Sequence, residues 1–95
     1  MNYTKHGEKR IRKRQKVSKK NVEKEIENAL EYGLTHSECK GKLKKYVDRL
    51  FFQYYNSNIR IYKYNIFIFT KDNKLITTYA LPGNLHKIFK KIYEK

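Results

Sequence analysis

The sequence predicts an α+β domain in which two N-terminal helices pack on a roughly four-stranded antiparallel sheet and a C-terminal helix follows, with the helices on one face of the sheet. Three observations support this class: apolar residues at helical spacing near the start, a middle part rich in aromatic and β-branched residues, and a second helical stripe near the end. With 95 residues, 39% of them hydrophobic, the chain has the size and apolar content of one small domain. We therefore expect a single domain over residues 1–95.

The N-terminal helices are predicted from capping residues and apolar spacing. Thr4–Gln15 is typical of a basic helix with Thr4 as its N-cap. Ser18 then begins a second helix that ends at Gly33, where glycine takes a left-handed cap without strain. We expect one face of this helix to be apolar and the opposite face to be acidic, either solvated or neutralising the first helix. The apolar residues are Val22, Ile26, Ala29 and Leu30, and the acidic residues are Glu23, Glu25, Glu27 and Glu31.

The sheet is predicted from runs of aromatic and β-branched residues separated by turn signals at 56–58 and 71–74. Ile66–Phe69 is apolar throughout, which is typical of a central strand covered on both faces. The expected strands are Leu43–Tyr55 (centred on Tyr46–Tyr54), Ile59–Tyr62, Ile66–Phe69 and Leu75–Ala80. Pro82 and Gly83 end the sheet, Asn84 is the expected cap of a last helix, and its apolar stripe comprises Leu85, Ile88, Phe89 and Ile92.

The chain carries a large positive charge, because 23 Lys and Arg residues stand against 9 Asp and Glu residues, for a formal net charge of +14. A polyanion would relieve the self-repulsion, so we expect nucleic acid as a partner, bound in a strongly salt-dependent way. A negatively charged membrane surface would also relieve it. No apolar run approaches the length of a membrane span, however, and no membrane partner is predicted.

Cys39 is the one cysteine of the sequence, so it forms no internal disulfide, and it has no Cys or His partner at metal-ligand spacing. We expect an incidental thiol in a polar loop, and no metal or other cofactor. His36 and His86 are expected in a loop and on a helix surface, outside any site. The charged N-terminal region is not followed by an apolar segment, so it does not resemble a signal peptide, and a cytoplasmic location is predicted.

The most informative segment lies near the N-terminus. In a helix, His6, Arg10 and Arg14 fall at i, i+4 and i+8 and share one face. An imidazole that moves protons near neutral pH, beside two guanidinium groups that hold a charged phosphoryl, suits RNA phosphodiester chemistry. The alternative for the same pattern is a basic helix that only coats a nucleic acid.

Together these motifs resemble an uncharacterised family of short bacterial and phage proteins. Thr4–Arg14 is similar to the family's opening pattern T-x-H-A-x-x-R-hydrophobic-x-x-R, a Ser-capped helix ending in glycine follows, and Thr77–Pro82 is similar to T-V-Y-x-L-P. The resemblance extends from Thr4 to Pro82. The chain departs from the pattern at Gly7, which replaces an alanine, and at Gln15, where a glycine is common.

That family looks like a branch of the barnase, EndoU, colicin and RelE superfamily of small ribonuclease toxins. The resemblance implies a RelE-like or barnase-like fold, RNA as substrate and cleavage without metal. It also implies an acidic antitoxin or immunity protein, and in some cases the ribosome, as partners. The implied catalytic residues are His6, Arg10, Arg14 and Thr77, with Tyr79 nearby.

The resulting hypothesis is attack of a ribose 2′-OH on its own phosphate, which leaves a 2′,3′-cyclic phosphate. His6 would transfer the proton, and the two arginines would hold the scissile phosphate. Thr77 would donate a hydrogen bond to a phosphate oxygen, and Tyr79 would orient the phosphate or stack on a base. Other basic residues are expected to contact phosphates without a catalytic role: Arg12, Lys13, Lys16, Lys19 and Lys20.

Two alternatives remain open at this stage. The first is a non-catalytic protein of phage or mobile-element origin that binds nucleic acid or inhibits a nucleic-acid-handling host complex. The second is a protein that binds no nucleic acid and uses its charge to bind an acidic protein. Neither composition nor spacing separates these from the nuclease hypothesis, because all three need a basic surface.

Overall fold

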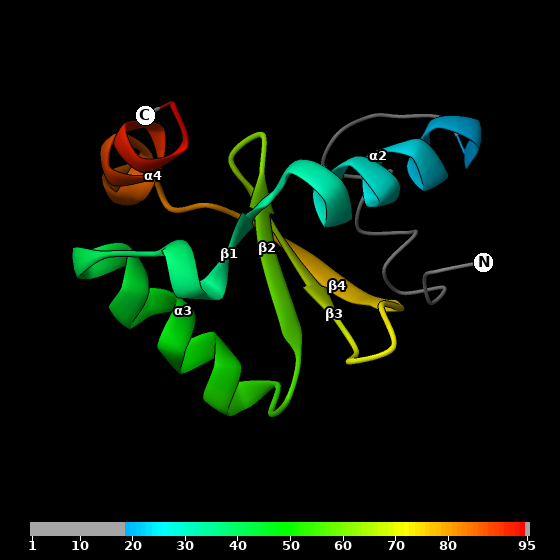
Figure 1. The fold of residues 1–95 in the computed structure, drawn as a ribbon, viewed down its shortest axis with the longest axis horizontal. Coiled ribbons are helices and arrows are strands. Elements are labelled where there is room, and N and C mark those ends of the chain that lie inside the picture. Colours follow the sequence, from blue (N-terminus) through cyan, green and yellow to red (C-terminus); the bar gives the residue numbers. More distant parts are fainter. Residues whose placement is uncertain (1–18, 95) are drawn as a thin grey trace.

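The computed structural model describes residues 19–94, which form a four-stranded antiparallel sheet with helices on both faces. Figure 1 shows α2 on one side of the sheet and α3 and α4 on the other. The strand order follows the sequence, β1-β2-β3-β4. The predicted α+β class is confirmed, while the predicted helix Thr4–Gln15 lies outside the described residues. The predicted placement of the helices on one sheet face is wrong, because both faces of β3 are apolar and each is covered by a helix. The elements are α2 (Lys19–Tyr32), β1 (Leu34–Thr35), the 3-10 helix η1 (His36–Glu38), α3 (Gly41–Gln53), β2 (Asn58–Tyr62), β3 (Asn65–Phe69), β4 (Leu75–Ala80), the 3-10 helix η2 (Gly83–Leu85) and α4 (His86–Tyr93).

Helix α2 covers one face of the sheet, as its apolar spacing predicts. Val22, Ile26 and Ala29 are buried in a cluster with Phe67, Phe69 and Leu75 of β3 and β4. The glutamate face is solvated at positions 23, 27 and 31, but Glu25 is largely buried and its Oε1 lies 3.4 Å from Lys63 Nζ. The acidic face is therefore partly paired with the sheet's β2–β3 turn.

The predicted strand Leu43–Tyr55 is wrong, because this segment folds as helix α3. Its buried residues, Leu43, Val47 and Leu50, have helical i, i+4, i+7 spacing, and the lysines between them are good helix formers. The fourth strand is instead β1, whose Leu34 and Thr35 pair with Ile61 and Arg60 of β2. Of the aromatic residues that indicated a strand, Tyr46, Phe51 and Tyr54 are half-buried, whereas Phe52 and Tyr55 are exposed.

Strand β3 is one of the two inner strands of the sheet and is covered on both faces, as its apolar run predicts. Ile66 and Ile68 point to the α3 and α4 side, whereas Phe67 and Phe69 point to α2. The β2–β3 turn has positive φ at two successive residues, 50° at Lys63 and 62° at Tyr64. This is the backbone of a two-residue hairpin turn whose twist matches that of the flanking strands.

Gly33 ends α2, but for a reason that the sequence did not indicate. Among the described glycines only Gly41 has positive φ, 59°, so Gly33 is not in the predicted left-handed conformation. A Cβ at position 33 would instead lie 2.4 Å from the Ala29 carbonyl oxygen and 3.0 Å from Arg60 Cβ. The glycine therefore allows α2 to approach β2 closely.

The C-terminal helix covers the same sheet face as α3, and Leu85 and Phe89 are buried there as predicted. The α-helix begins at His86, because Gly83–Leu85 forms a 3-10 turn first. His86 Nε2 donates a hydrogen bond to the Leu81 carbonyl oxygen at 2.8 Å, which ties the helix start to the end of β4. Across residues 19–94, every helix is too short or too polar to cross a membrane.

Candidate nucleic-acid interface

The predicted catalytic set falls in two parts of the chain. His6, Arg10 and Arg14 lie outside the described residues, as do the predicted phosphate contacts Arg12, Lys13 and Lys16. Lys19 and Lys20 form the first turn of α2. Only Thr77 and Tyr79 can be placed with their side chains.

Thr77 and Tyr79 share one face of β4, the face that packs against α3. Thr77 pairs with Ile68 and Tyr79 with Ile66, both of which belong to the α3-side core. Thr77 is 1% exposed, whereas Tyr79 is half-buried. The Tyr79 hydroxyl is hydrogen-bonded to that of Tyr54, which caps the C-terminal end of α3. Tyr79 is therefore the one of this pair that reaches toward the surface.

A groove of about 310 Å³ lies beside this tyrosine pair, between the end of α3 and the start of β4. Tyr55 and Lys71 contribute an aromatic ring and an ammonium group to its wall. Such a pair can hold a base and a phosphate, respectively. The groove is lined by Tyr54, Tyr55, Asn56, Ser57, Thr70, Lys71 and Ile76.

The solvent side of α3 carries a second, more basic groove of about 380 Å³. Lys42, Lys45 and Arg49 line it and are spaced i, i+3, i+7, so they lie on one face of the helix; we call these three residues the basic stripe. The Arg49 guanidinium carbon lies 5.8 Å from the centre of the Tyr46 ring. The opposite wall comes from Pro82, Asn84 and Leu85.

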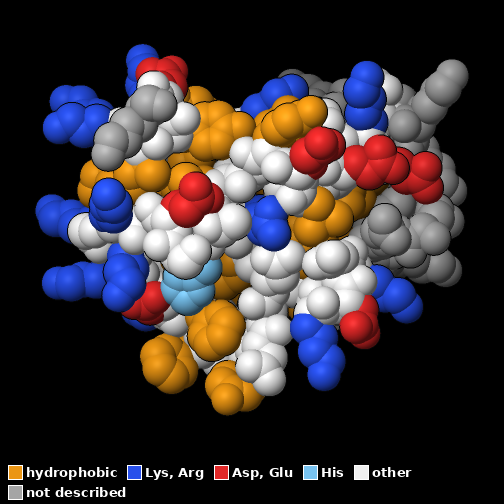
Figure 2. Space-filling view, viewed as in Figure 1, with side chains coloured by type: hydrophobic (Ala, Val, Ile, Leu, Met, Phe, Trp, Pro, Cys, Tyr) orange, Lys and Arg blue, Asp and Glu red, His pale blue; other side chains and the backbone are white. Residues whose placement is uncertain are grey.

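Charge is unevenly distributed about the sheet. Helices α3 and α4 carry seven Lys and Arg residues against one Asp, whereas α2 carries four Glu against three Lys. Figure 2 shows blue side chains gathered at the left, over α3 and α4, and red ones at the upper right, over α2. An anion approaching the described part of the chain is therefore drawn to the α3 and α4 side. The cations of that side are Lys42, Lys44, Lys45, Arg49, Lys87, Lys90 and Lys91.

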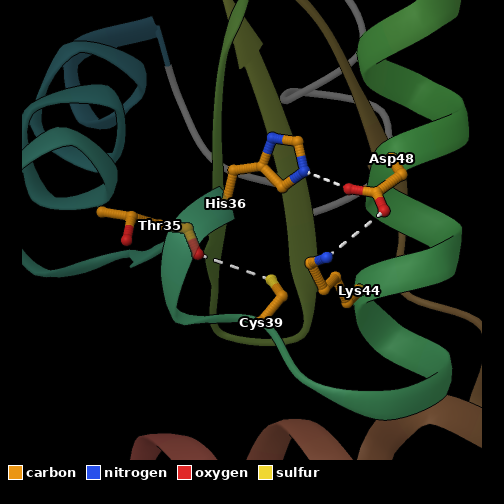
Figure 3. Close-up of polar contacts among 5 residues, drawn as sticks. All are labelled: Thr35, His36, Cys39, Lys44 and Asp48. Atoms are coloured by element: carbon orange, nitrogen blue, oxygen red, sulfur yellow. Dashed lines mark hydrogen bonds and ion pairs between the residues drawn. The ribbon is translucent and has the colours of Figure 1, made fainter.

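His36 forms a hydrogen bond with Asp48 that the sequence did not predict (Figure 3). Its Nε2 lies 2.5 Å from Asp48 Oδ1, and the other carboxylate oxygen lies 4.0 Å from Lys44 Nζ. The imidazole also packs on Phe51, with ring centres 5.3 Å apart. Histidine and aspartate come from η1 and α3, twelve positions apart, so no local spacing pattern could have linked them. The contact joins the two elements and also orients an imidazole that is 30% exposed.

Cys39 is not in a polar loop, contrary to prediction, but is buried in the core between η1 and α3. Its Sγ donates a hydrogen bond to the Thr35 carbonyl oxygen at 3.4 Å (Figure 3). Desolvation by burial raises the pKa of this thiol to about 12, with Glu38 and then Asp48 adding to the effect. The thiol is therefore protonated at neutral pH and is not suited to nucleophilic chemistry.

Within the described range 19–94, no three His, Cys, Asp or Glu side chains come together as ligands for a metal ion. The arrangement that the structure does present is a basic helical surface next to exposed aromatic rings.

We found no family model, curated protein or solved structure that matches the chain.

Proposed function

We propose that this protein is a cytoplasmic RNA-binding protein that holds the phosphate backbone along α3. The basic stripe carries this proposal, because its three cations line one groove on the side of the sheet opposite the glutamates of α2. Lysine and arginine neutralise phosphates and release their counterions, which supplies most of the affinity for nucleic acid regardless of sequence. Arg49 can also contact a phosphate through two donors.

The expected size of the effect follows from counterion release. For a single strand, each neutralised phosphate contributes a slope of about −0.7 to the dependence of log affinity on log salt. Loss of one contact therefore weakens binding about fivefold at roughly 0.1 M salt and reduces the slope by about 0.7. The salt slope thus reports the number of phosphate contacts, whatever the RNA sequence.

The chain offers a matched pair of variants. Lys45 and Lys24 are both exposed lysines on helices, one in the basic stripe and one on the acidic face of α2. Lys45→Glu should weaken binding of a labelled oligonucleotide at least fivefold in fluorescence anisotropy, whereas Lys24→Glu should change it by less than about twofold. Arg49→Glu should behave like Lys45→Glu. Equal losses of affinity for Lys45→Glu and Lys24→Glu would show that binding depends on net charge alone and would rule out this groove as the RNA-binding site.

We propose cleavage as a second function, supported by the helical spacing of His6, Arg10 and Arg14 and by the resemblance to the ribonuclease toxin superfamily. The reaction is attack of a 2′-OH on the adjacent phosphate, with loss of the 5′-oxygen and formation of a 2′,3′-cyclic end; Tyr79 would assist from β4, whereas Thr77 is 1% exposed and would act only by supporting that face of the strand. An acidic antitoxin or immunity protein would then bind the basic surface and inhibit the enzyme. The ribosome would be the site at which such an enzyme binds its RNA substrate.

One assay distinguishes RNA binding from RNA cleavage. Labelled RNA incubated with the protein in chelator should be cut to products with a 2′,3′-cyclic end, and His6→Ala should abolish the cleavage while salt-sensitive binding persists. Intact RNA at every protein concentration, with binding still observed, would leave the non-catalytic binding protein or host-complex inhibitor as the function. Absence of binding at moderate salt would favour an acidic protein as the partner.

A further inference from the structure

The C-terminal end of α3 exposes two aromatic rings that the core does not use. Phe52 is 78% exposed and Tyr55 is 74% exposed. Figure 2 shows hydrophobic side chains gathered at the lower edge of the molecule, over the end of α3. Water disfavours such surfaces, so adjacent exposed rings indicate a contact with a ligand or partner. We refer to Phe52 and Tyr55 as the aromatic end.

The rings of the aromatic end project from a fixed support. Phe52 lies within the helix, and Tyr55 follows its C-cap. The Tyr55 ring packs on that of Phe51 with centres 6.0 Å apart, and Phe51 packs in turn on His36, which is held by Asp48. A ring ordered before binding loses little conformational freedom when a ligand stacks on it.

The aromatic end continues the basic stripe. Lys45, Arg49 and Phe52 are spaced i, i+4, i+7 and share the outward face of α3, so Phe52 follows Arg49 by about 4.5 Å along the helix axis. Tyr55 lines the groove that also contains Lys71. A chain of phosphates that follows the cations therefore brings its bases to the two rings.

We propose that Phe52 and Tyr55 stack on unpaired bases, so that the RNA bound by this protein is single-stranded. The inference rests on the proposed RNA-binding function and specifies the substrate class for that site. In a duplex the faces of the bases are already covered by neighbouring pairs, whereas the bases of a single strand are free to stack on protein rings. Cations at each end of the aromatic pair favour a polyanion over an apolar protein partner, whose interface would need a much larger area than two rings provide.

The test compares two labelled RNAs, a single strand of about 12 nucleotides and a duplex of about 16 base pairs, by fluorescence anisotropy. Phe52→Ala and Tyr55→Ala should each weaken binding of the single strand roughly tenfold, since stacking on one ring is typically worth a factor of about 5 to 150. Their affinity for the duplex and the salt slope should stay unchanged. Tyr32→Ala is the matched control, because Tyr32 is 56% exposed but lies at the end of α2.

A second variant reports base stacking directly through its fluorescence. The chain has no tryptophan, so Phe52→Trp introduces one reporter that still stacks. Its emission should be quenched by the single strand and not by the duplex, and its affinity should match or exceed that of the wild type. Circular dichroism of all variants checks that the helix remains folded.

The outcomes distinguish this inference from the function on which it rests. If Lys45→Glu weakens both RNAs while Phe52→Ala and Tyr55→Ala weaken neither, the protein binds RNA and the stacking proposal is overturned. Equal weakening of single strand and duplex by the alanine variants would also overturn it, because base stacking cannot act on a duplex. If the wild type binds neither RNA, both proposals fail, and a protein that requires the aromatic end becomes the partner to seek.

Discussion

Replacement of Gly33 by alanine tests why α2 ends where it does. The added Cβ would lie 2.4 Å from the Ala29 carbonyl oxygen and 3.0 Å from Arg60 Cβ. The first neighbour is backbone and accepts the 3.0 Å hydrogen bond from the Gly33 amide, so it cannot move without disturbing the helix end. The residue that follows, Leu34, pairs with Ile61 in the sheet, so the strand cannot easily move away either.

The expected cost of Gly33→Ala is a net loss of about 2 kcal/mol in the free energy of unfolding. Overpacking of this kind costs about 1–3 kcal/mol, and a contact this short with a backbone atom belongs at the upper end. The smaller freedom of alanine in the unfolded chain offsets about 0.4–1 kcal/mol. For a domain of this size, the net loss lowers the melting temperature by about 10 °C.

Urea denaturation followed by circular dichroism measures this loss, and two other glycines provide controls. Gly83 has open space where a Cβ would be added and an ordinary backbone, so Gly83→Ala should change stability by less than about 0.5 kcal/mol. Gly41 also has open space but a φ of +59°, so Gly41→Ala should cost about 1 kcal/mol through backbone strain alone. A Gly33→Ala variant as stable as Gly83→Ala would refute the close-packing argument.

Three further predictions concern the described residues. Arg60→Met should lower the free energy of unfolding by about 1–2 kcal/mol in urea titrations, because Arg60 Nη1 donates to the Leu30 carbonyl oxygen at the C-terminal end of α2 at 2.5 Å. Hydrogen bonds from the Thr35 backbone and hydroxyl lower the pKa of Glu38 from its ordinary value of 4.5. The stabilisation is therefore present above about pH 4.5 and lost as pH falls through the lowered folded-state value, so the melting temperatures of wild type and Glu38→Gln should converge in acid. The buried Cys39 thiol should resist iodoacetamide at about pH 8 in the native protein and react once urea unfolds it; fast native labelling would contradict its pKa of about 12.

Local spacing along the chain was sufficient to predict several elements. The apolar face of α2 and the stripe of α4 follow from apolar residues at helical spacing, and β3 follows from an uninterrupted apolar run that is buried at four successive positions. The 71–74 turn is also predicted correctly, and Asn73 has a positive φ there, 66°, a conformation that asparagine tolerates. These features depend on neighbours within a few positions, which the sequence displays directly.

The segment that became α3 shows where local spacing is ambiguous. Its aromatic residues favour a strand, while Leu43, Val47 and Leu50 favour a helix. The choice between helix and strand depends on the rest of the fold. The edge of β2 already pairs with β1, and the apolar α3-side face of the sheet must be buried by a helix. The same choice places the basic stripe and the aromatic end at the surface, so the candidate interface could not be located before the helix was known.

The sequence by itself determined the large positive charge, the fold class and the residues able to handle phosphate, since these depend on composition and local periodicity. Tertiary structure alone decided which cations share a groove, why Gly33 has no room for a side chain, and that His36 meets Asp48. The physical reason is that each of these relations joins elements brought together by burial of the sheet's two faces. Contact between two separate elements is not encoded in the spacing of either element alone.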